Sequence, residues 1–260
     1  MRNIFAIIIG MLVFTGFTAC DKTYDGKTAY ELYELANEKS NSVKSMTVSM
    51  NGVIGIDINN LSMDTKIDGV VKMIIRSETD FDMKMDIITS VMGEQHEMNA
   101  YYIDGFMYMD LYGMKMKIPL DAEKAAEMSY SQSLAFPESA VYKQSAKSEG
   151  EDIRISFTLR GDALNEILAP IINNLTESMG TDDINIININ DIYYKSLLAK
   201  DYTIKNYRMV FDAEMSSNTL GGNFKMSYDI TAYISDIDST IIIMPDDIDE
   251  YTDIESGFSF

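Results

Sequence analysis

The chain has 260 residues, of which 41 are acidic and 21 are basic, so its formal net charge is −20 at neutral pH. So acidic a surface repels nucleic acid and is expected to offer no basic patch to anionic lipid headgroups. The single cysteine excludes an intrachain disulfide, so the fold has to be held together by its core. The length and composition predict one large domain over residues 28–260.

Residues 1–19 have the pattern of a secretory signal. Arg2 gives a basic start, and the apolar stretch that begins at Ile4 is shorter than a membrane-spanning helix needs. Phe17-Thr18-Ala19-Cys20 resembles the bacterial lipobox, whose cysteine receives diacylglycerol, although Phe17 replaces the usual leucine. The resemblance implies anchoring through the lipid on Cys20 at the extracytoplasmic face of the cell membrane. The alternative is a stray thiol behind an ordinary secretory signal.

Residues 20–27 then form the lipidated N-terminus and a short polar tether, which would hold the domain close to the membrane. Thr28 and Glu31 have the spacing of a capping box, in which each side chain accepts a hydrogen bond from a backbone amide at the start of a helix. A helix is therefore predicted from Thr28 to about Asn41, with Leu32 and its neighbours on one apolar side.

From residue 45 to residue 119 nearly every other residue is apolar, which is the period of a strand with one apolar and one polar side. Asn59-Asn60 and Asp104-Gly105 supply turns. The predicted strands cover residues 46–58, 61–75, 81–91, 98–103, 106–110 and 114–118. Long strands of this kind favour a curved antiparallel sheet that is wet on one side and covered on the other.

The second half is less regular. Its predicted elements are a helix over 121–129, a loose connector over 131–150, a strand over 153–159, a helix over 161–179, a helical turn over 195–201, and strands over 202–215, 223–235 and 239–244. The order of helix, strands and terminal proline in the two halves indicates a distant internal duplication. Residues 181–191 are rich in Asp and Asn but lack the glycine and terminal glutamate of a calcium-binding EF-hand loop, so a turn or edge strand is expected over a calcium site.

The order of these elements resembles the LolA-like and LppX/LprG-like lipoproteins of bacterial envelopes. The segment from Tyr101 to Tyr108, the Lys117-Ile118-Pro119 exit, Lys205-Asn206 and Ile243-Met244-Pro245 are similar to an uncharacterised group of such proteins from Gram-positive bacteria. The resemblance implies an α+β fold, in which a large curved antiparallel sheet, an incomplete β-barrel, wraps around a few helices. It also implies that lipid or acyl chains occupy the space between them.

An enzyme needs convergent polar groups, and this chain is poorly supplied with them. Its one histidine, His96, lies in a polar run, and Cys20 is taken up by the lipid anchor. Acidic pairs such as Asp80/Asp82 and Asp246/Asp247 are unremarkable in so acidic a chain. We therefore expect no catalytic residue, no metal and no cofactor.

Twelve of the 20 methionines lie between residues 45 and 119. Methionine is flexible, so it fills irregular gaps in a core, and the same property adapts a surface to apolar ligands of varied shape. Both interpretations stay open: a binding site for a lipid or other apolar ligand, or a packed core in a protein that binds an envelope protein partner. The residues predicted for the ligand are Met50, Ile54, Met73, Phe81, Met83, Met85, Met107 and Met109, with Tyr101, Tyr102 and Tyr108 at the mouth.

Overall fold

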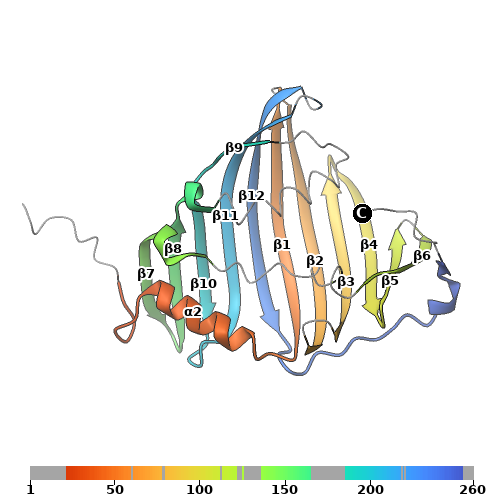
Figure 1. Cartoon of the computed structure of the whole chain (residues 1–260), viewed down its shortest axis with the longest axis horizontal. Helices are drawn as coiled ribbons and strands as arrows, with labels where there is room; N and C mark the ends of the chain where they lie inside the picture. The colour runs from red at the N-terminus through yellow and green to blue at the C-terminus, as the bar shows by residue number, and fades with distance from the viewer. Residues whose placement is uncertain are drawn as a thin grey trace, which may run out of the picture.

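The structure, a computed structural model, describes residues 22–59, 61–77, 80–111, 113–121, 125, 136–164, 185–217, 219 and 221–253. One large open sheet dominates this part of the chain, and the helix α2 crosses one side of it (Figure 1). The sheet is built from strands of both halves of the sequence, so the described residues form one unit.

The elements follow one another in this order: α2 Ala29–Ser40, β1 Ser45–Ile58, β2 Leu61–Ser77, β3 Asp80–Val91, β4 Glu94–Ile103, β5 Phe106–Leu111, β6 Met114–Pro119, η1 Glu138–Ala140, β7 Val141–Glu149, β8 Asp152–Leu159, η2 Gly161–Leu164, β9 Asn185–Ile189, β10 Ile192–Leu198, β11 Ile204–Ser217, β12 Gly222–Ser235, η3 Ile248–Glu250 and β13 Thr252–Asp253.

The strands are arranged in the order β13-β6-β5-β4-β3-β2-β1-β12-β11-β10-β8-β7, and β9 pairs with the far part of β11. All these pairs are antiparallel except β13 with β6. The two halves of the chain meet where β1 pairs with β12 in an unbroken register from Thr47–Ser235 to Ile58–Phe224. The strands β1 and β2 therefore occupy the middle of the sheet.

The helix α2 begins with the predicted capping box: Thr28 Oγ1 accepts from the Glu31 amide, and Glu31 Oε2 accepts from the Thr28 amide at 2.7 Å. Leu32 and Tyr33 point into a core made with β7, β8, β10, β11 and β12. Tyr33 contacts the rings of Phe157 and Tyr194 edge to face, with ring centroids 5.4 Å apart in both pairs. Burial raises the pKa of Tyr33 to about 12, so its phenol stays neutral.

A second, smaller core lies on the same side of the sheet, over β3, β4 and β5. Its buried members are Phe81, Met83, Ala100, Tyr102, Met107 and Ala125. Within the described residues the two cores stay separate: Ile54 of β1 packs against the first core, and Val71 of β2 packs against the second.

Both edges of the sheet are covered by the ends of the described chain. At the β7 edge, Lys22 bridges to Ser145, and the Ala146 amide donates to the Lys22 carbonyl at 2.6 Å. At the β6 edge, β13 adds two paired residues, and the Lys115 ammonium contacts Asp247 and Glu250 of the preceding segment. Covered edges protect a sheet from pairing with another chain.

Residues 22–27 of the predicted tether have a defined structure. Residues 22–27 form a small hairpin in which Tyr24 and Lys27 exchange two backbone hydrogen bonds of 2.9 and 3.0 Å. Asp25 and Gly26 take the positive φ angles that such a tight turn requires. The Tyr24 ring packs against the α2 core, so this segment belongs to the domain.

The strands predicted from residue 45 to residue 119 are confirmed, as are the strands at β8, β11 and β12. Residues 185–189 form β9, which agrees with the strand expected within residues 181–191. The loose connector is wrong in part because residues 141–149 form β7, and the helical turn at 195–201 is wrong because those residues lie mainly in β10.

The predicted strand over residues 239–244 is also wrong. The chain turns at Asp236 and Asp238, both at positive φ. The Thr240 amide then donates to the side-chain hydroxyl of Ser45 at 3.1 Å instead of to a backbone carbonyl of a paired strand. Ile241 and Ile243 are exposed. This segment runs along one end of the sheet, from β12 to the β6 edge (Figure 1).

Several predictions fall outside the described residues. They are the secretory signal, Cys20, and most of the helices expected over 121–129 and 161–179. Of those two helices, the structure describes a helical Ala125, whose amide donates to the Asp121 carbonyl, and a 3-10 turn over Gly161–Leu164. The described part of the chain contains one α-helix, α2, where a few helices were expected.

Replacing Leu32 by alanine should lower the free energy of unfolding by about 2–5 kcal/mol, because Leu32 is fully buried beneath α2 and its loss leaves a cavity. Urea denaturation followed by circular dichroism measures the change. The exposed Glu38 on the same helix is the matched site, and Glu38→Ala should change the stability by less than about 0.5 kcal/mol. Equal effects would show that α2 does not cover the sheet.

Candidate ligand-binding face

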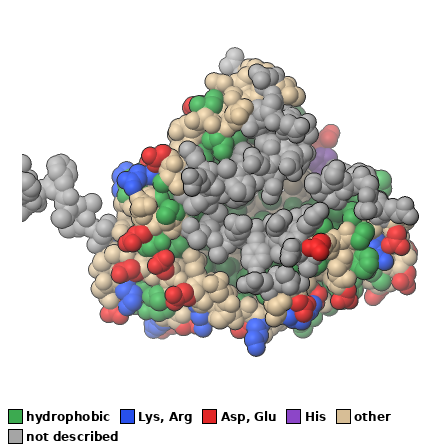
Figure 2. Space-filling view, in the orientation of Figure 1, with side chains coloured by type: hydrophobic (Ala, Val, Ile, Leu, Met, Phe, Trp, Pro, Cys, Tyr) green, Lys and Arg blue, Asp and Glu red, His purple; other side chains and the backbone are tan. Residues whose placement is uncertain are grey.

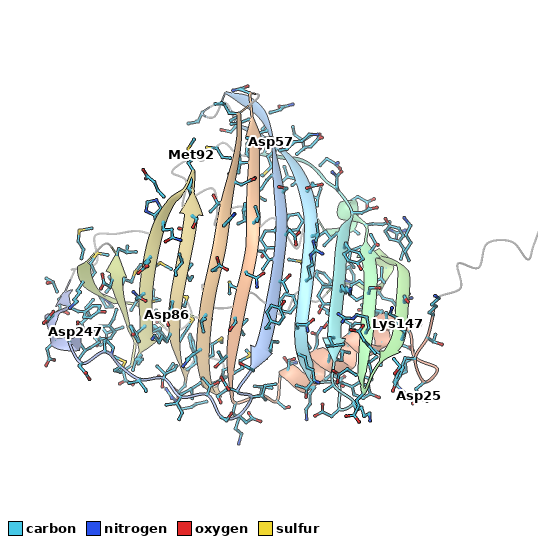
Figure 3. All side chains as sticks on the ribbon, turned by 180° about the vertical axis from the view of Figure 1, so that it is seen from behind. Asp25, Asp57, Asp86, Met92, Lys147 and Asp247 are labelled. Atoms are coloured by element: carbon cyan, nitrogen blue, oxygen red, sulfur yellow. The ribbon has the colours of Figure 1, made fainter. Side chains whose placement is uncertain are left out.

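The strand register places most of the apolar strand residues on the side that carries α2, which we call the α2 face. Met46 pairs with Met73, Met73 with Met83, Met83 with Tyr102, and Tyr102 with Met107. Because paired residues point to the same side of a sheet, one apolar row crosses five strands. The residues between them, most of them polar, form the opposite side, which we call the outer face and which Figure 3 shows.

Most of the predicted ligand-binding residues share the α2 face. Phe81, Met83, Tyr102 and Met107 are buried within the smaller core. The other predicted residues on this face are half-buried: Met50, Ile54, Met73, Met85 and Met109.

Among the described residues, the middle of the α2 face is less completely buried than its two flanks. On β1 and β2, the described strands at the centre of the sheet, every apolar side chain that points to the α2 face is half-buried or exposed. The fully buried side chains lie on either side, in the two cores. Central strands are normally the best covered part of a sheet, so this strip is an unusual feature that can accept an apolar molecule.

Gly69 of β2 leaves space on the strip for its neighbours. A Cβ atom on Gly69 of β2 would lie 3.3 Å from Met50 Cγ and 3.4 Å from Ile87 Cγ1. The missing side chain lets the flexible Met50 lean across β2. Methionine and glycine together leave a low, adaptable surface between the two cores.

Tyr101 and Tyr108 do not lie on the α2 face, which corrects the prediction that they share one mouth with Tyr102. They pair with each other across β4 and β5 on the outer face. Adjacent residues of a strand point to opposite sides, so Tyr101 and Tyr102 cannot share a face.

The outer-face tyrosines have structural partners. Lys84 Nζ lies 5.3 Å from the centre of the Tyr101 ring, and Tyr108 contacts Tyr251 edge to face with centroids 5.6 Å apart. Lys117 Nζ lies 4.4 Å from the Phe106 ring centroid. The two lysine–ring contacts join neighbouring strands, and the Tyr108–Tyr251 contact fastens the segment before β13 to β5.

The predicted set omits residues of the central strip. Met46 and Val48 of β1 and Val71 of β2 belong to it and are half-buried. The period-two pattern already marked them as apolar, but the pattern does not say which apolar residues lie between two cores. That information comes from the position of β1 and β2 within the strand order.

Two hollows that the described residues form lie elsewhere, at the tip of the sheet where β1 turns into β2. One has a volume of about 530 Å³ and is lined by Leu61, Ile187 and Phe224 among polar residues, and another has about 310 Å³ beside Met63 and Met92. Both are open to solvent, and neither lining includes a predicted ligand-binding residue. Met92 is labelled near this tip in Figure 3.

The described residues show no group of three or more His, Cys, Asp and Glu side chains that could hold a metal ion. His96 lies half-buried on β4, opposite Thr89 of β3. Within the same described ranges, none of the helices has the length and apolar character needed to cross a membrane.

Comparison with protein families matches residues 28–252 to a family of unknown function, DUF6612. The chain belongs to this family. No curated protein matches the sequence. The match includes α2 and all of the described strands except the last residue of β13, so the two cores and the central strip fall within the family's domain.

Two solved structures from mycobacteria align with most of the chain. The lipoprotein LppX of Mycobacterium tuberculosis shares 8% identity, with a TM-score of 0.43, over 83% of this chain and 98% of that chain. LprF from Mycobacterium bovis shares 11% identity, with a TM-score of 0.46, over 84% of this chain and 96% of that chain. The architecture described above rests on the strand pairing of this chain itself.

Met83→Ala should lower the free energy of unfolding by about 2–5 kcal/mol, whereas Met50→Ala should lower it by about 1 kcal/mol. The reason is that Met83 is buried in the smaller core and Met50 is half-buried in the central strip. Urea unfolding of both variants after delipidation checks the difference. Equal losses would mean that the strip is packed core and holds no space for a ligand.

Proposed function

We propose that this protein is an extracytoplasmic lipoprotein, anchored through Cys20, that holds a lipid or another molecule with an acyl chain against the central strip of its α2 face. The observation that carries the proposal is the partial burial of the apolar side chains of β1 and β2 between two well-buried cores. An apolar molecule laid along this strip would complete the core.

The hydrophobic effect supplies the affinity in this proposal. Burial of each methylene group of a ligand contributes about 0.8 kcal/mol, so a chain of several carbons offsets the loss of its freedom. The methionines of the strip adapt to chains of different length, because their side chains have three rotatable bonds and a polarisable sulfur atom. The site would therefore select for apolar character more than for exact shape.

One pair of polar side chains lies on the α2 face beside the strip. Thr89 of β3 stands opposite His96 of β4, whereas the β1 side of the strip stays apolar from Met46 to Ile58. A polar headgroup would be stable beside Thr89 and His96, with its acyl chain on the strip, because each part then meets groups of its own polarity.

The double variant Met50→Asp, Met73→Asp should lower the affinity for a fluorescent fatty acid at least tenfold, because two carboxylates desolvate poorly beside an acyl chain. Titration monitored by fluorescence measures the affinity. Ser49→Asp is the matched control, since Ser49 neighbours Met50 on the outer face, and it should leave binding unchanged. A delipidated wild-type protein that ignores the probe contradicts the proposal and favours a packed core with a protein-interaction role.

Cys20→Ala should release the protein from membranes into the soluble extracytoplasmic fraction, because the lipid is the proposed anchor. Fractionation of cells with immunoblotting measures the distribution, and metabolic labelling with an alkyne fatty acid should label the wild type alone. Continued membrane retention of the unlabelled variant would refute lipid anchoring at Cys20.

A further inference from the structure

The β7 edge lies close to the point where the proposed lipid anchor would enter. Lys22 is fixed to β7 by its bridge to Ser145 and by the 2.6 Å hydrogen bond from the Ala146 amide. Only Asp21 separates Lys22 from Cys20. Two residues span at most about 7 Å, so an anchored Cys20 would bring the β7 edge to the lipid headgroups.

A row of cations begins at this edge and runs across the outer face. Lys147 of β7 stands opposite Arg154 of β8, and Lys195 of β10 stands opposite Arg208 of β11. Arg154 and Lys195 are diagonal neighbours, since Arg154 pairs with Leu197 of the same strand as Lys195. We call these four side chains the basic row; Lys147 is labelled at the β7 edge in Figure 3.

The repulsion within the basic row lowers the stability of the fold. Like charges directly opposite each other destabilise a sheet, and the row contains two such pairs. Glu149 accepts from Arg154 Nε at 2.6 Å, and Asp229 accepts from Arg208 Nε at 2.8 Å. Lys147 and Lys195 form no ion pair within 4.0 Å with any carboxylate of the described residues. Glu149 lies near both, since the hydrogen bond from Arg154 and then the charges of Lys147 and Lys195 lower the pKa of its carboxyl. The two acidic partners, Glu149 and Asp229, therefore balance part of the charge of the four cations, and the remainder is available to a partner.

On the α2 side of the molecule near the same edge, the helix carries acidic side chains. Glu31, Glu34 and Glu38 lie on the helix, and Figure 2 shows acidic side chains over this region. An anionic surface would therefore repel the α2 side and attract the basic row.

We propose that the anchored protein rests with the outer face of β7, β8 and β10 on anionic lipid headgroups, held there by Lys147 and Lys195. The proposal rests on the anchor at Cys20 inferred above. Tyr193, which lies on the same outer face and is 40% exposed, would contact the headgroup layer, where a tyrosine ring is stable. This orientation turns the central strip of the α2 face away from the bilayer.

The lack of tryptophan and the single cysteine make a direct test available. The chain from Cys20 onward, which contains every described residue, is coupled through its thiol to a maleimide lipid in vesicles of phosphatidylcholine and phosphatidylglycerol at about 7:3. Tyr193→Trp reports on the outer face, and Leu61→Trp reports on the exposed tip. A nitroxide on the lipid headgroups quenches a tryptophan that lies against the membrane.

We expect quenching of Tyr193→Trp to exceed that of Leu61→Trp at least threefold, and to fall to the Leu61→Trp level in pure phosphatidylcholine or at high salt. Adding Lys147→Glu and Lys195→Glu to each reporter should abolish the difference in quenching between the two tryptophans. Lys66→Glu with Lys225→Glu changes the net charge equally at exposed sites near the tip and should preserve it.

Equal quenching of the two reporters, or quenching that ignores the lipid charge, would overturn the proposed orientation. Because the maleimide lipid supplies the anchor chemically, this result does not depend on whether cells acylate Cys20. Failure of the Cys20→Ala fractionation would instead refute the native anchor while leaving the charge-dependent orientation measurable.

Discussion

The antiparallel register of one wide sheet is the constraint on which the rest of the structure depends. Because the strands from β6 to β8 pair antiparallel and side chains alternate along each of them, most apolar strand residues are directed to the α2 face. Each described core covers one flank of this face, with α2 over β8 and β10 and the smaller cluster over β3 to β5. Among the described residues, the half-buried strip on β1 and β2 lies between these two cores.

The local pattern predicted much of the fold. The capping box at Thr28 and the strands from β1 to β6 follow from spacing and alternation alone, because each signal lies within a short stretch. The strand β7 was missed, since its pairing with β8 includes a register shift and its polar residues show little alternation. Residues 239–244 contain an apolar run from Ile241 to Met244 that is typical of a buried strand, but they lie outside the sheet, and the Thr240 amide donates to the Ser45 hydroxyl.

The candidate site was predictable only in part, because local patterns do not reveal burial or contacts between distant strands. Alternation placed Met50, Met73 and Met83 on one side, yet it could not distinguish the half-buried Met50 from the buried Met83. The basic row was missed altogether, because net charge of −20 says nothing about where lysines meet across strands. Lys147 and Lys195 are 48 residues apart in sequence and come together only through β8.

The most direct measurement for the central claim is mass spectrometry of lipids extracted from protein purified gently from membranes and thoroughly washed. If the central strip holds an acyl chain, the extract should contain acyl species in near-stoichiometric amount, and the Met50→Asp, Met73→Asp variant should carry far less. An extract in which the wild type and this variant carry the same trace amounts would contradict the account.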